Sequence, residues 1–308
     1  MATKKAKSTG KSVSRPAKQE KATCPECSCA PCACGKGFKD FFGPKYDTRE
    51  NILSIFRTPR ILGAIGGELI GTFILTLLVL VLTLQFFGGL YVMFALIGLS
   101  MVIFPLSGAN LNPIITLGLA VTRRISPIRA IFYIVAQLIG GMLAWLVIQM
   151  FLNNNGLEAG QATAATMAAI TEDTQVGMIF AGEIIAALIF AFFFARALKV
   201  KKNLLGFATT IGTGYVIAWT ITFLIPMALF GIQQAGNIYI FNPAIALAME
   251  AFMVEGTNAG QAVLAYAVLP LLAGVVGFLI SDLVSCAANT GAPAEQNGCE
   301  PDSYCCKA

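Results

Sequence analysis

Hydrophobic residues in this chain of 308 residues are gathered into long blocks that short polar stretches separate. A helix needs about 20 mainly apolar residues to cross the hydrocarbon core of a bilayer. Six windows approach or exceed that length, at about 61–84, 89–106, 127–151, 176–198, 204–229 and 262–285. The pattern therefore predicts an all-α integral membrane protein with six transmembrane helices.

Two further apolar runs, at about 113–121 and 243–253, are too short to cross a membrane, and each begins with Asn-Pro. Proline suits the first position of a helix, and asparagine is a good N-cap. Each run is therefore predicted to be a half-helix that starts at Asn112 or Asn242. Non-helical backbone at membrane depth is tolerated only where it is buried in protein or lines a cavity. These re-entrant segments therefore indicate a pore.

The two halves of the chain share one pattern. The first spanning helix contains GELIGTFIL and the fourth contains GEIIAALIF, and each is followed by another span and an Asn-Pro half-helix. Because each half contains three spans, an odd number, the second half inserts upside down, as in many transport proteins. One membrane domain is predicted at 61–285, with repeats at about 61–151 and 176–285. The second repeat is longer between its glutamate and its Asn-Pro, which indicates an insertion before Asn242.

Charge is distributed unevenly along the chain. Only 12% of the residues are charged, yet residues 1–60 hold 13 Lys and Arg against 5 Asp and Glu. With this segment in the cytoplasm, every Lys and Arg falls on the inner side and the outer loops carry only acidic charge, as the positive-inside rule requires. The sequence predicts a multi-pass membrane protein with both termini cytoplasmic. No nucleic-acid binding is expected, since the rest of the chain offers no basic face.

The two ends of the chain are predicted to be tails. Residues 1–37 are polar and are expected to be disordered, with no apolar run that would serve as a signal peptide. Residues 38–60 mix Phe and Ile with charges, which is typical of a segment lying at the membrane surface. Residues 286–308 form a second cytoplasmic tail.

Several motifs resemble the major intrinsic proteins, the family of aquaporins and glycerol facilitators. They are GELIGTF, SGANLNPIITLG, YIVAQLIGGMLA, GEIIAALIF, FNPA and LPLLAGVVGFLI, spread over 61–285. The resemblance implies an aquaporin-like fold and a passive channel for water, glycerol-like solutes, urea, ammonia or gases. It also implies homotetramers in lipid and no cofactor. No enzyme is expected, since the chain has no His, no nucleophile motif and no phosphate loop.

The residues at the two Asn-Pro motifs are the candidate pore-lining residues. As N-caps, the two asparagines would accept a backbone N–H with the side-chain oxygen and leave the amide N–H₂ free for the lumen. The positive ends of both half-helices would lie there as well, which disfavours cations. The family resemblance implies the same role. The candidates are Asn112, Pro113, Ile114, Asn242, Pro243 and Ala244.

Three positions depart from the family pattern: Ile114 replaces a usual Ala, Asn110 a common His, and Ile245 the usual Arg of the outer constriction. Ile114 would either narrow the lumen or pack. Carried over without gaps, the rest of that filter is Val92 and Tyr239, and the fourth position is Thr213 or Phe230. This set is apolar apart from a phenol, so we expect passage of wider or less polar solutes, with water still possible.

Two glutamates, Glu68 and Glu183, lie inside spanning helices. An intramembrane carboxylate is a functional candidate, and here it would serve an ion-coupled secondary transporter. The resemblance implies instead that each carboxylate holds the backbone of a re-entrant loop.

Cysteines are concentrated in the tails. Five crowd the N-terminal tail, and their C-x2-C spacing is compatible with a soft metal ion such as zinc. This allows a third reading, a membrane-anchored metal-binding protein; free thiols or lipid attachment are the alternatives. The candidate ligands are Cys24, Cys27, Cys29, Cys32 and Cys34.

Overall fold

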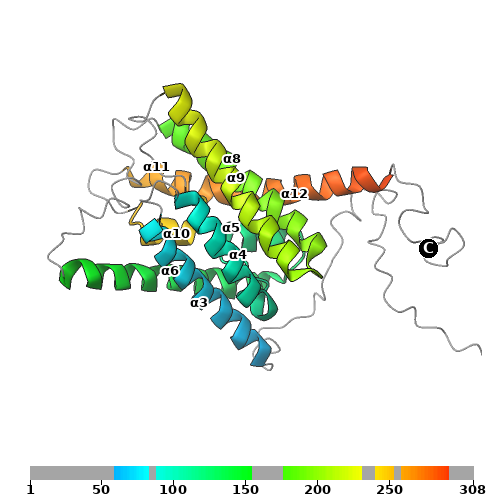
Figure 1. Ribbon diagram of the computed structural model, residues 1–308, viewed down its shortest axis with the longest axis horizontal. Helices are drawn as coiled ribbons and strands as arrows, with labels where there is room; N and C mark the ends of the chain where they lie inside the picture. The colour runs from blue at the N-terminus through cyan, green and yellow to red at the C-terminus, as the bar shows by residue number, and fades with distance from the viewer. Residues whose placement is uncertain (1–58, 83–87, 155–175, 231–239, 253–257, 291–308) are drawn as a thin grey trace, which may run out of the picture.

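The computed structural model describes residues 59–82, 88–154, 176–230, 240–252 and 258–290. Within these ranges the structure consists of helices joined by short connections (Figure 1). The long helices are α3 (Pro59–Leu82), α4 (Gly88–Ser107), α6 (Pro127–Asn154), α8 (Val176–Ala197), α9 (Leu204–Phe230) and α12 (Leu269–Thr290). The last continues from α11 (Ala259–Val263) and the π-helical turn η4 (Leu264–Val268), and a 3-10 turn, η3 (Leu198–Val200), follows α8.

Six of the described helical segments are long and apolar enough to cross a membrane, which confirms the predicted spans. The half-helices are also present, as α5 (Pro113–Val121) and α10 (Pro243–Ala248). The second is shorter than the predicted 243–253. Met249 caps it and Glu250 adopts a φ of +57°, a left-handed conformation that a helix cannot continue through.

The long helices form an open series of neighbours. In order along it, α6 contacts α3, α3 contacts α4, α4 contacts α9, α9 contacts α8, and α8 contacts α12. The half-helices lie between its two ends, since α5 contacts both α12 and α6, and α10 contacts α6 and α3. Each half-helix thus packs against the last long helix of the opposite repeat.

Small residues bring these elements close together. A Cβ atom added to Gly140 of α6 would lie 2.5 Å from the carbonyl oxygen of Leu69 on α3. At the next position, a Cβ on Gly141 would lie 2.4 Å from the carbonyl oxygen of Ala244 in α10. Helices in a membrane gain much of their association energy from such close backbone approach. Gly141 therefore fixes how deeply the second half-helix can sit in the protein.

Candidate functional site

The two half-helices begin with the same local structure. The Oδ1 atom of Asn112 accepts a hydrogen bond from the backbone N–H of Ile114 at 2.9 Å. Asn242 Oδ1 accepts from the N–H of Ala244 at 3.1 Å. Both asparagines have extended backbone, and proline follows each of them. A cap of this kind stabilises a helix by about 0.5–2 kcal/mol, so both short helices gain a fixed starting point.

The two asparagines are also linked across the protein. Asn112 Nδ2 donates to the carbonyl oxygen of Phe241 at 2.9 Å, and Asn242 Nδ2 donates to that of Leu111 at 3.1 Å. Each amide nitrogen carries two N–H bonds, and this reciprocal bond uses one. The sequence had suggested that the whole N–H₂ group is free. The second N–H bond of each asparagine amide remains free. The bond to the opposite loop fixes the direction in which each side chain points.

Glu68 holds the loop that precedes the first half-helix. Its fully buried carboxylate accepts the backbone N–H groups of Asn110 and Leu111 at 3.0 and 2.8 Å. Ser107 Oγ and Gln137 Nε2 also donate to it, at 2.5 and 2.7 Å. Four donors around one carboxylate offset the cost of burying it.

Glu183 does the same for the second loop. It accepts from the backbone N–H groups of Ile240 and Phe241 at 2.5 and 2.8 Å, and it too is fully buried. Phe241 has a φ of +30° and Leu111 a φ of +51°, which cost energy in a residue with a side chain. The glutamates are bonded to the N–H groups of these two strained residues, so each carboxylate stabilises a loop shape that the backbone alone disfavours.

A small cavity lies beside the paired asparagines. Its volume, counted for the centres of water-sized molecules, is about 30 Å³. Water needs roughly 10–15 Å³ on this measure, so the cavity has room for about two or three water molecules. The residues around it are Leu75, Val79, Val92, Leu96, Asn110, Leu111, Asn112, Phe190, Tyr215, Ile240, Phe241, Asn242, Ile245 and Met249. Most of the wall is aliphatic or aromatic, and the polar side chains are three amides and one phenol.

Two of the filter residues expected from the sequence line the cavity, and the others do not or lie outside the described residues. Val92 and Ile245 both line the cavity. Tyr239 lies outside the described residues, as does the side chain of Phe230. Thr213 is exposed and does not line the cavity, where α9 contributes Tyr215 instead.

Sequence reasoning missed the aromatic part of this wall. The ring of Phe241 lies 5.2 Å from that of Tyr215 and 5.8 Å from that of Phe190, measured between centroids. These three rings come from the second re-entrant loop, α9 and α8. Because the longer second repeat hides the correspondence between α9 and the first half, no gapless comparison would have selected Tyr215.

The other residues of the Asn-Pro motifs do not line this cavity. Pro113, Ile114, Pro243 and Ala244 are buried but absent from its wall. Ile114 packs on α12, where a Cβ on Gly274 would lie only 2.1 Å from its Cγ2 atom. Of the two alternatives for this bulky residue, packing is the one observed, because the glycine leaves room for it.

The model of the major intrinsic protein family matches residues 87–284, well over half of the chain. The chain belongs to the major intrinsic protein family. Aquaporins of this family are channels and not enzymes. The family accounts for the paired Asn-Pro half-helices and for the long helices that enclose them.

Individual relatives agree with this assignment. The chain is 29% identical to Aquaporin-B of Dictyostelium discoideum over 151 residues, covering 46% of this chain and 51% of that protein. It is 30% identical to Aquaporin TIP2-2 of Zea mays over 143 residues, covering 46% and 53%. The chain thus spans about half the length of the curated relatives it matches. The aquaglyceroporin structure from Plasmodium falciparum shares the fold, with a TM-score of 0.57, 18% identity and coverage of 75% of this chain and 100% of that one.

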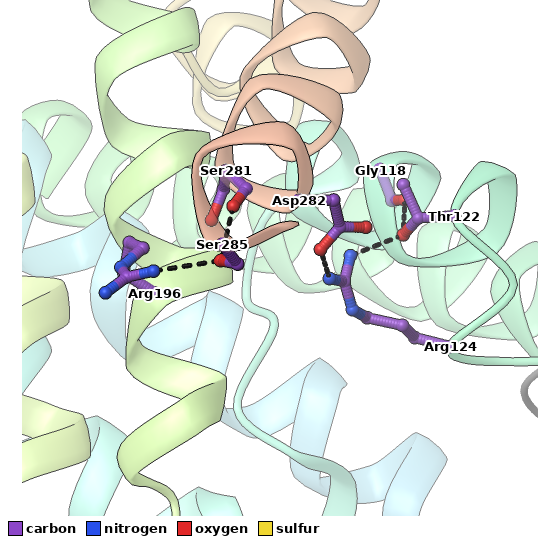
Figure 2. Close-up of polar contacts among 7 residues, drawn as sticks. All are labelled: Gly118, Thr122, Arg124, Arg196, Ser281, Asp282 and Ser285. Atoms are coloured by element: carbon purple, nitrogen blue, oxygen red, sulfur yellow. Dashed lines mark hydrogen bonds and ion pairs between the residues drawn. The ribbon is translucent and has the colours of Figure 1, made fainter. Parts of the chain in front are cut away.

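In this aquaporin-family chain, a polar cluster anchors the far end of the first half-helix (Figure 2). Arg124 follows α5 and forms an ion pair with Asp282 of α12 at 2.5 Å. Its guanidinium also donates to Thr122 Oγ1 at 2.7 Å and lies 5.3 Å from the ring centroid of Phe278. A cation here also suits the negative end of the helix dipole. We call Arg124, Thr122, Asp282 and Phe278 the α5 clamp.

The second half-helix has a counterpart to this clamp. Trp145 of α6 donates its indole N–H to Glu250, which directly follows the cap of α10, at 2.5 Å. Since α6 and α12 are the equivalent helices of the two repeats, each half-helix is anchored to the equivalent helix of the opposite repeat. The capped ends meet at the cavity and the other ends are anchored to neighbouring helices.

The cysteine cluster expected in the N-terminal tail, Cys24 to Cys34, lies outside the described residues. Within the described ranges, no group of three or more His, Cys, Asp or Glu side chains is placed to hold a metal ion.

Proposed function

We propose that this protein is a passive transmembrane channel for water and other small uncharged solutes. The observation that carries the proposal is the pair of crossed asparagines beside a cavity whose remaining wall is apolar. A solute oxygen passing there meets one free N–H bond from each amide. The apolar wall gives it few other partners, so it is held weakly and leaves easily, as conduction requires.

We expect the filter to admit several neutral solutes and not water alone. Ile245 stands where the family usually has arginine, and it lines the cavity together with Val92. No Lys, Arg, Asp or Glu is among the described lining residues. A wall without fixed charge does not compensate an ion for the water molecules that it loses on entry. The same loss of hydration costs a neutral molecule much less free energy. We therefore expect glycerol-like solutes or urea to pass as well as water.

The glutamates fit this reading better than ion coupling. Glu68 accepts four hydrogen bonds, and Glu183 accepts two from the second loop. Neither residue lines the cavity. A coupling site must meet the ion pathway, so these carboxylates support loop anchoring.

Orientation and assembly are part of the same proposal. The distribution of Lys and Arg supports cytoplasmic termini. Large exposed apolar side chains on the spanning helices, such as Phe94, Val102 and Ile131, suit contact with lipid or with other copies of the chain, and the family resemblance supports a homotetramer. The membrane domain is assigned to 61–285, with tails at 1–60 and 286–308.

Stopped-flow light scattering on proteoliposomes tests the proposal. We expect uptake of water, glycerol or urea to exceed that of protein-free liposomes and to rise linearly with the solute gradient. Addition of ionophores should leave the flux unchanged. A flux that saturates at low concentration and collapses with an ion gradient would point to a coupled transporter.

A further inference from the structure

Asn110, two residues before the first Asn-Pro, differs from the paired asparagines in one respect. It lines the same cavity and is only 4% exposed. Its Nδ2 atom, however, has no hydrogen-bond partner among the described residues. Asn112 and Asn242 each donate one amide N–H to the opposite loop, whereas neither amide N–H of Asn110 is donated.

The backbone of Asn110 is nevertheless held in place. Its N–H group donates to Glu68 Oε1 at 3.0 Å, and the N–H of Leu111 donates to the second oxygen of the same carboxylate. The side chain is therefore attached to a fixed part of the loop. As placed, the Nδ2 atom is almost inaccessible to a water-sized molecule. A buried amide N–H₂ without a partner is unfavourable, so a rotation of the side chain that brings this group to an accepting molecule in the cavity relieves that cost.

The surroundings indicate which molecules benefit. The polar side chains of the wall are Asn110, Asn112, Asn242 and Tyr215, and none of them is a carboxylate. The carbonyl groups of Leu111 and Phe241, beside the paired asparagines, already accept the crossed hydrogen bonds. Each of the four polar side chains can donate a hydrogen bond from the wall. The matching solute is a small neutral molecule with a hydrogen-bond-accepting oxygen.

We propose that Asn110 is a specificity-determining residue of the pore, which donates to the accepting oxygen of neutral solutes such as urea. This inference rests on the proposed channel function and assigns one further donor to it. Water depends less on Asn110 than urea does, because each water in a file keeps hydrogen bonds to its neighbours. The urea carbonyl relies on donors from the wall.

The test compares urea and water permeability of four proteins in proteoliposomes at equal protein content. Asn110→Leu keeps the approximate size and removes the donors. Asn110→His restores an N–H donor at the same place. Ser100→Ala is the matched control, since the Ser100 hydroxyl is also buried without a partner but does not line the cavity.

We expect Asn110→Leu to lower the ratio of urea to water permeability about two- to tenfold, the range for loss of one hydrogen bond. Asn110→His should recover most of that ratio, and Ser100→Ala should keep it. The melting temperature of Asn110→Leu should not fall, because no bond within the protein is lost. An unchanged ratio, or an equal loss of both fluxes with a lower melting temperature, would refute the role of Asn110 while wild-type flux upholds the channel. A wild-type protein that conducts neither solute would overturn both proposals.

Discussion

Replacing Asp282 by Asn should weaken the α5 clamp and displace the first half-helix. The two side chains of the ion pair are 17% and 11% exposed, so the pair lies between a surface pair and a buried one. Surface pairs contribute about 0.2–1 kcal/mol, and removing one partner of a buried pair costs about 3–5 kcal/mol. Arg124 keeps Thr122 and Phe278 as partners in the variant. We therefore expect Asp282→Asn to lower the free energy of unfolding by about 2 kcal/mol.

Weakening the clamp should also move the capped end of the half-helix, where Asn112 lies. The helix α5 has nine residues and is about 13 Å long at 1.5 Å per residue. A tilt of about 5° around its middle or its far end moves Asn112 by roughly 0.5–1 Å, which is enough to lengthen a 2.9 Å hydrogen bond past its useful range. Water flux per channel should fall along with stability.

A double-mutant cycle measures this coupling. The free energy of unfolding in detergent is compared for Asp282→Asn, Arg124→Gln and the double variant, and water flux is measured for each. The two changes should cost less together than the sum of the single changes. Ser285→Ala is the control on the same helix. It removes an exposed contact with Arg196 and a hydrogen bond to the Ser281 carbonyl one turn away, and it should cost less than about 0.5 kcal/mol. Purely additive changes, with normal flux in all variants, would refute the clamp.

Three further changes address other parts of the site. Ile245→Arg places a cation on the cavity wall; glycerol and urea permeability should fall more than water permeability, and equal ratios would remove Ile245 from the filter. Glu183→Gln exchanges one accepting oxygen for an N–H₂ group that faces the N–H of Ile240 or Phe241. The free energy of unfolding should fall by about 1–3 kcal/mol, and the melting temperature with it. A stable protein whose flux depends differently on ions would favour an ion-coupled transporter. Gly141→Ala brings a methyl group to 2.4 Å from the carbonyl of Ala244; both flux and melting temperature should fall, and an unchanged protein would show that α10 is free to shift.

The sequence alone predicted the features that depend on local chemistry. Asn-Pro at 112–113 and 242–243 contains both a cap and a helix start, so the half-helices could be placed without any tertiary information. The spans followed from apolar length. The end of α10 could not be predicted in this way, because the sequence from Met249 to Phe252 stays mostly apolar while Glu250 adopts a left-handed backbone.

Contacts between distant residues were beyond the reach of sequence patterns. Arg124 and Asp282 are 158 positions apart, and nothing in either local sequence pairs them. The sequence left open whether Ile114 narrows the lumen or packs, and the packing depends on Gly274 of α12, a residue far away along the chain. Tyr215 was missed by two positions on α9, where a shift of two residues turns a helix face by more than half a turn. Which face of a helix meets the cavity depends on packing angles, and a single sequence does not contain them.

The proposed channel carries neutral solutes through the cavity beside Asn112 and Asn242. The most direct measurement compares osmotic water flow in proteoliposomes for the wild-type protein and for Val92→Trp, at equal protein content. Val92 is fully buried on the cavity wall, so the larger ring should fill the cavity. We predict flow well above that of empty liposomes for the wild type, and flow close to empty liposomes for a folded Val92→Trp variant. Equal flow through both proteins would place the pathway elsewhere and contradict the account.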